Sequence, residues 1–209
     1  MVSISEWWLI LKQQFYQISY LEAIGVAFGV AEAFLAKNNK VWLYPCGLIN
    51  ILVTMYIYLD IRLYAEILLQ GYYFVMSLYG WFIWASKKNN TNHVSLCTTK
   101  DRLIACFIVI FSWILLYFFL TKYTNSDVPV LDSLVSAFAW AGMWLLAKRK
   151  LDNWIFLNIS NFISVPLLIH KGLILYSILT IFLFIIAIFG YLDWKKLVHL
   201  QNLKLKNNP

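Results

Sequence analysis

The stretch LYAEILLQGYYFVMSLYGWFIW, from Leu63 to Trp84, guides the interpretation of the whole chain. It is long and apolar enough to cross a bilayer as a single helix. Four of its polar side chains recur at steps of four, three and four residues, which places them on one helical face. They are Glu66, Gln70, Tyr73 and Ser77. Because lipid offers no hydrogen-bond partners, this face must point to protein or water. We therefore predict that it lines a path for a small polar aromatic molecule.

The composition is that of an integral membrane protein. Of the 209 residues, 62% are hydrophobic and 13% are charged, and the mean hydropathy is +0.70. Soluble domains, by contrast, are about half apolar and about a quarter charged. The predicted class is all-α, with seven transmembrane helices formed by seven apolar segments. The segments are residues 20–36, 42–59, 63–85, 103–121, 131–147, 154–170 and 173–192. Before them, residues 1–19 are predicted to form an amphipathic helix in the membrane interface, with a frayed terminus as the alternative.

The distribution of lysine and arginine predicts the orientation in the membrane. Thirteen of the 17 basic residues lie in the connectors after the first, third, fifth and seventh segments. Because basic residues accumulate on the cytoplasmic side, this pattern puts the N-terminus outside and the C-terminus inside. The same asymmetry accounts for most of the net charge of +7, so we infer no nucleic-acid partner.

An internal repeat relates the segments on either side of residues 86–130. At an offset of 110 in the numbering, the first segment matches the fifth, and the third ends in YGWFIW where the seventh ends in FGYLDW. The second matches the sixth at an offset of 112, which sets Trp42 over Trp154. Three crossings are an odd number, so one extra helix is needed to give both repeats the same orientation. The sequence therefore predicts a 3+1+3 parallel repeat, a SWEET-like arrangement.

This repeat divides the chain into five predicted parts. They are an interfacial segment (1–19), a first three-helix repeat (20–85), a linker containing transmembrane helix 4 (86–130), a second three-helix repeat (131–192) and a cytoplasmic basic tail (193–209).

Amide and aromatic side chains at mid-membrane depth extend the candidate substrate path. The full set of candidate substrate-binding residues is Asn50, Gln70, Tyr73, Ser77, Trp140, Trp154, Asn158 and Asn161. Amides at this depth can also hold helices together, but so many beside aromatic rings favour a path. Amides suit hydroxyl and amide groups, and aromatic faces attract planar rings and delocalised cations. The two carboxylates Glu32 and Glu66 are interpreted as entrance charges or, more simply, as interfacial groups.

The sequence contains no pattern typical of an enzyme. Its three cysteines and three histidines lack metal-ligand spacing, and we find no nucleophile–base pair or nucleotide-binding motif. We therefore predict no metal, no cofactor and no enzymatic activity. No lysine or arginine within the spans could meet a phosphate, which argues against a nucleotide substrate. The alternative class is a membrane enzyme or a non-transport subunit of a larger complex.

Four motifs resemble the PnuC-type vitamin transporters. They are WLYPCGLIN at 42–50, the opening stretch at 63–84, NWIFLNISN at 153–161 and FGYLDW at 189–194. The resemblance implies uptake of nicotinamide riboside across the bacterial inner membrane by facilitated diffusion, with cytoplasmic phosphorylation trapping the substrate. It also implies a homotrimer in which each protomer has its own path. The segment LNISNFISVPLLIH, at 157–170, departs from the more aromatic family pattern, so thiamine and riboflavin stay open as alternative substrates.

The candidate residues receive roles from this substrate. The pyridinium ring is expected to stack on Trp140, Tyr73 or Trp154. The ribose hydroxyls are expected to bond to the amides, which are Asn50, Gln70, Asn158 and Asn161.

Overall fold

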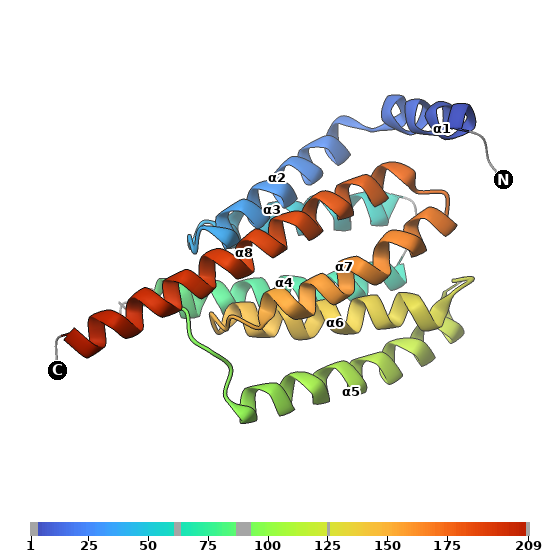
Figure 1. Ribbon diagram of the computed structural model, residues 1–209. Coiled ribbons are helices and arrows are strands. Elements are labelled where there is room, and N and C mark those ends of the chain that lie inside the picture. Colours follow the sequence, from blue (N-terminus) through green and yellow to red (C-terminus); the bar gives the residue numbers. More distant parts are fainter. Residues whose placement is uncertain (1–3, 61–63, 87–92, 125, 208–209) are drawn as a thin grey trace.

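The computed structural model describes residues 4–60, 64–86, 93–124 and 126–207, and this part of the chain is helical (Figure 1). The helices are α1 (Ile4–Gln17), α2 (Tyr20–Lys37), α3 (Leu43–Asp60), α4 (Tyr64–Ala85), α5 (Thr99–Tyr123), α6 (Pro129–Ala147), α7 (Asn153–His170) and α8 (Ile174–Asn207). The all-α prediction is confirmed, and each predicted apolar segment coincides with one helix. Within the terminal segment, Ile4–Gln17 also forms a helix, α1.

Several of these helices are suited to a membrane. Within the described residues, α3, α5, α6 and α8 are each long and apolar enough to cross a bilayer. Helices α1 and α2 meet the same test only as a pair, and they are bent by 103° at the break between them. Helix α8 continues past its apolar part, so the predicted tail 193–209 is helical as far as Asn207.

Helix α5 shows the contrast between a face that meets lipid and a face that meets protein. It lies at the edge of the molecule beside α6 (Figure 1). Its inner face buries Ala105, Val109, Ser112, Leu116 and Leu120, which recur at steps of four and three residues. Its outer face exposes large apolar side chains, which include Leu103, Phe107, Ile110, Phe111, Ile114 and Phe118. An apolar surface of this extent is typical of a membrane-embedded protein.

The two groups of three helices, α2–α4 and α6–α8, are built alike at a single offset of 110 in the numbering. Asn39 and its counterpart Arg149 adopt the same left-handed backbone conformation, with φ of 52° and 51°. Each donates its backbone N–H to the residue three positions earlier, in both cases over 2.9 Å. The helices that follow begin at Leu43 and Asn153, which differ by the same offset. The turns before α3 and α7 and the starts of these two helices are thus related by the same offset of 110.

The predicted offset of 112 between the second and sixth segments is wrong, and Trp154 corresponds to Tyr44 rather than to Trp42. Matching tryptophan to tryptophan is misleading here because Trp42 is 66% exposed, whereas Tyr44 is 1% and Trp154 is 3% exposed. Each buried ring lies against a glycine of the next helix. A Cβ on Gly80 would lie 2.4 Å from the Tyr44 ring, and one on Gly190 would lie 2.7 Å from the Trp154 ring.

Two tryptophans join the groups reciprocally. Trp84 of α4 donates its indole N–H to the carbonyl of Ala147 at the end of α6, over 3.0 Å. Trp194 of α8 donates to the carbonyls of Ala36 and Lys37 at the end of α2, both over 3.1 Å. Lys37 and Ala147 are counterparts at the same offset, so the two groups exchange equivalent bonds. The groups are held together at the end where α2 and α6 finish, and a cavity lies between them.

Candidate functional site

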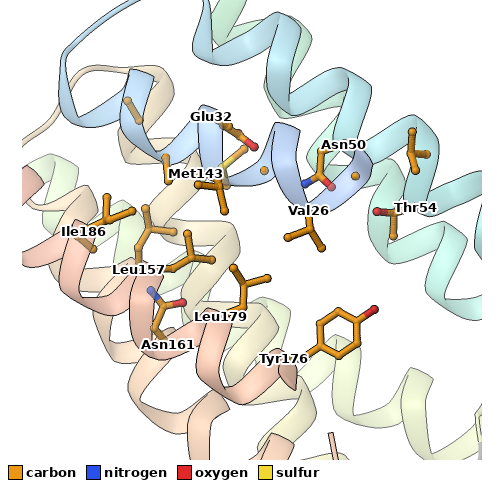
Figure 2. Close-up of a pocket in the computed structure, with 18 of the residues that line it drawn as sticks. Val26, Glu32, Asn50, Thr54, Met143, Leu157, Asn161, Tyr176, Leu179 and Ile186 are labelled. Carbon is orange, nitrogen blue, oxygen red and sulfur yellow. The ribbon is translucent and has the colours of Figure 1, made fainter. Parts of the chain in front are cut away.

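A cavity of about 760 Å³ lies between the two groups of helices (Figure 2). Its walls come from α2, α3, α6, α7 and α8, and most of the lining is aliphatic. Small-molecule sites in proteins typically measure roughly 300–1,000 Å³ and combine an apolar wall with a few polar groups. The polar or aromatic members of this wall are Glu22, Glu32, Asn50, Thr54, Tyr58, Trp154, Asn161 and Tyr176.

Two amides face the cavity from opposite walls. Figure 2 shows Asn50 on α3 and Asn161 on α7, with their amide groups directed toward the space between them. Asn50 reaches this position because α2 presents two glycines one turn apart. A Cβ on Gly29 would lie 3.0 Å from Nδ2 of Asn50, and one on Gly25 would lie 3.5 Å from Oδ1. Small residues on one helical face let neighbouring membrane helices approach closely.

The amides break the symmetry of the repeat. At the offset of 110, the counterpart of Asn161 is Ile51, and the counterpart of Asn50 is Ser160, which donates its hydroxyl to the carbonyl of Val135 over 2.8 Å. The two groups of helices therefore supply different polar atoms to a shared space. Such an arrangement suits a ligand that is itself asymmetric.

Trp154 is one of the aromatic residues of the wall, together with Tyr58 and Tyr176. Its ring lies on Gly190 and meets the Trp194 ring edge-on, at 5.5 Å between centroids. Its indole nitrogen is buried and has no hydrogen-bond partner among the described residues. A buried aromatic ring with an unused N–H can stack on a planar ligand and also donate a hydrogen bond.

Glu32, which the sequence suggested was an entrance charge or an interfacial group, belongs to the cavity wall. Its carboxylate lies against the backbone of Gly47 in α3, where a Cβ would be 2.6 Å from Oε1. No hydrogen bond or ion pair involves this carboxylate in the part of the chain that the structure describes. A signal was present in the sequence. Gly25, Gly29, Glu32 and Ala36 are spaced by four, three and four residues, and all four line the cavity.

Comparison with known proteins agrees with this architecture. Residues 19–196 match the model of a family described as nicotinamide mononucleotide transporter. The chain belongs to this transporter family. Curated relatives named nicotinamide riboside transporter PnuC, from Escherichia coli (strain K12) and Shigella flexneri, are each 27% identical over 207 residues, covering 86% of this chain and of each relative. A crystal structure of the vitamin B3 transporter PnuC has a similar fold, with a TM-score of 0.69 at 18% identity, covering 92% of this chain and 88% of that one.

Family membership confirms the resemblance inferred from the four sequence motifs. The chain is therefore a multi-pass membrane protein of a bacterial transporter family. Three of its candidate residues, Asn50, Trp154 and Asn161, meet at the cavity between the helix groups.

In this family member the other candidate residues lie elsewhere. Among the described residues, α4 contributes none to the cavity wall, because it packs against α3 and α6. Gln70, Tyr73 and Ser77 therefore lie outside the wall, and Ser77 is fully buried with its hydroxyl unpaired within the described residues. The side chain of Glu66 is outside the part of the chain that the structure describes. The proposed path along this face of α4 stays a prediction.

The last two candidates sit at other contacts. The Trp140 ring is stacked on Tyr72 of α4 at 4.2 Å between centroids, and the Tyr72 hydroxyl donates to the carbonyl of Trp140 over 2.8 Å. Asn158 lines a second hollow of about 410 Å³ between α7 and α8, which also touches Trp154. Trp154 thus lines both spaces.

Proposed function

We propose that this protein takes up nicotinamide riboside by facilitated diffusion, with cytoplasmic phosphorylation maintaining the inward gradient. The observation that carries the proposal is the cavity between the two helix groups, which combines two amides, a tryptophan and carboxylates. Nicotinamide riboside consists of a flat cationic ring and a ribose. The tryptophan suits the ring, and Asn50 and Asn161 suit the ribose hydroxyls. This role is transport without chemical conversion of the substrate.

The charge of the cavity favours the riboside over its phosphorylated form. Its described lining includes Glu22 and Glu32 but no lysine, arginine or histidine. Phosphate recognition depends on such cationic donors, and two carboxylates would repel a phosphate. A mononucleotide therefore fits this cavity poorly, although the family carries that name.

We further propose that α2–α8 form seven membrane spans in the 3+1+3 arrangement, in the bacterial inner membrane. The constant offset of 110 in the backbone supports two parallel repeats, with α5 as the connecting span. The basic residues that follow α2 and α6 support a cytoplasmic location for that end and for the C-terminus. The N-terminus is then outside, with α1 in the membrane interface. On the basis of the family resemblance, we also propose that the protein forms a homotrimer in which each protomer has its own path.

Uptake of labelled nicotinamide riboside into proteoliposomes tests the proposal. Wild-type protein should equilibrate the riboside across the membrane without ATP or an ion gradient, and Asn161→Ala should slow uptake at unchanged protein stability. Gln70→Ala tests the path along α4, which lies outside the cavity. Normal uptake by both variants would contradict the assignment of both residues.

A thermal-shift panel distinguishes the alternatives. Stabilisation by nicotinamide riboside, thiamine or riboflavin follows from mass action when the folded state binds the ligand. Stabilisation only by thiamine or riboflavin would replace the proposed substrate by that vitamin. Stabilisation by none of the three would favour a non-transport membrane subunit or an enzyme.

A further inference from the structure

We propose that Glu32 selects ligands with a positively charged ring by acting as the counter-ion inside the cavity. This inference rests on the proposed function and concerns how the same cavity distinguishes its ligands. It assigns a role in specificity to a residue of α2 that the sequence suggested was an entrance charge or an interfacial carboxylate.

The position of Glu32 is the first argument. It lies one turn before the buried Ala36 and one turn after Gly29, on the face of α2 that lines the cavity. Figure 2 shows it at the edge of the space that Asn50 and Asn161 face. The carboxylate is held there by close packing on Gly47, since Cδ and both oxygens lie within 3.0 Å of a Cβ built on that glycine. No side chain at position 47 separates it from α3.

The second argument is that nearby basic groups have other contacts. Lys37 forms an ion pair with Asp193 at 3.5 Å and lies over the Phe189 ring. The guanidinium of Arg149 lies over the Trp84 ring at 4.0 Å. Within the described residues, Glu32 is left with no cationic partner of the protein's own.

The energetic consequence follows from partial burial. A half-buried carboxylate without a cationic partner is costly to keep charged, and a cation placed beside it recovers part of that cost. A neutral ligand of the same shape recovers none. The Trp154 face on the same cavity adds a second preference for a delocalised cation. The cavity should therefore distinguish two ligands that differ only in ring charge.

A pair of isosteric ligands provides the test. Nicotinamide riboside carries a pyridinium ring, and benzamide riboside has the same carboxamide and ribose on a neutral phenyl ring. Binding of both to the purified full-length protein is measured by isothermal titration calorimetry. The variants are Glu32→Gln, which keeps the size and removes the charge, Glu32→Asp, which keeps the charge on a shorter side chain, and Asp60→Asn, which changes an exposed carboxylate outside the cavity wall.

Wild-type protein should bind the cationic riboside more tightly than its neutral isostere. Glu32→Gln should weaken binding of the cation by about ten- to a hundredfold and change binding of the isostere by less than about threefold. Glu32→Asp should retain part of the preference, and Asp60→Asn all of it. An unchanged preference in Glu32→Gln, with nicotinamide riboside still bound, would overturn the inference. Wild-type protein that binds neither ligand would instead overturn the proposed function.

Discussion

Gly190→Ala should weaken both the fold and ligand binding, because it displaces Trp154. The new Cβ would lie 2.7 Å from Cε2 and Cζ2 of the indole. Ordinary contact begins at 3.4 Å, so the ring must move by about 0.7 Å or the helices must separate. Overpacking of this kind costs about 1–3 kcal/mol. Since Trp154 also lines the cavity, the same movement changes the surface that a ligand meets.

Two matched glycine variants separate the structural effect from the functional one. Gly80→Ala places a Cβ 2.4 Å from the Tyr44 ring, the counterpart of Trp154, but Tyr44 does not line the cavity. Gly80→Ala should destabilise the protein at least as much as Gly190→Ala does, and it should leave ligand affinity unchanged. A Cβ on Gly71 would meet no described residue within 4 Å. Gly71→Ala should stabilise α4 by up to about 1 kcal/mol through helix propensity alone.

The assay combines thermal unfolding in detergent with calorimetric binding of nicotinamide riboside. For a chain of this length, about 2–4 °C of unfolding temperature corresponds to each kcal/mol. Gly190→Ala and Gly80→Ala should therefore unfold about 2–12 °C below wild type, and only Gly190→Ala should lose affinity. If Gly190→Ala is destabilised but binds with wild-type affinity, Trp154 is not a ligand contact. If neither variant is destabilised, the close packing of the rings on the glycines is refuted.

Further predictions concern the contacts at the end where α2 and α6 finish. Trp84→Phe and Trp194→Phe each remove an indole donor from a buried contact, so each should lower the free energy of unfolding by about 1–3 kcal/mol. If a thermal-shift experiment shows that only one of the two variants is destabilised, the bonds of Trp84 and Trp194 are not equivalent. Burial, together with the smaller effect of the nearby Asp152 carboxylate, raises the pKa of the Cys97 thiol to about 11. When Cys97 is the only cysteine, maleimide labelling at pH 8 should therefore be slow, and Asp152→Asn should accelerate it by increasing the thiolate fraction. Equal labelling rates would refute this electrostatic coupling.

Local patterns in the sequence were sufficient to locate the helices. Apolar runs predicted each helix from α2 to α8 because a membrane helix must satisfy its backbone hydrogen bonds internally and present apolar side chains outward. The repeated endings YGWFIW and FGYLDW supported the internal repeat, and the structure shows Trp84 and Trp194 making equivalent bonds. The helices and the repeated endings depend on residues that are close together in the chain, whereas the tryptophan bonds join residues far apart in it.

The correct offset in numbering between α3 and α7 could be found only from the structure. Residue identity matched Trp42 to Trp154, but burial pairs Trp154 with Tyr44. Packing against a glycine of the next helix is a contact between distant residues, and either aromatic side chain can make it. Identity of residue type was therefore a poor guide to equivalence at this position.

For the cavity too, the sequence predicted part of the arrangement and the structure decided the rest. Helical spacing places Gln70, Tyr73 and Ser77 on one face of α4, and equally places Gly25, Gly29 and Glu32 on one face of α2. Periodicity identifies residues that share a face but contains no information on which helix that face meets. Helix packing turns α2 toward the cavity and α4 toward α3 and α6. The polar face of Leu63 to Trp84 was therefore readable from the chain, whereas the role of Glu32 became visible only once distant helices were packed together.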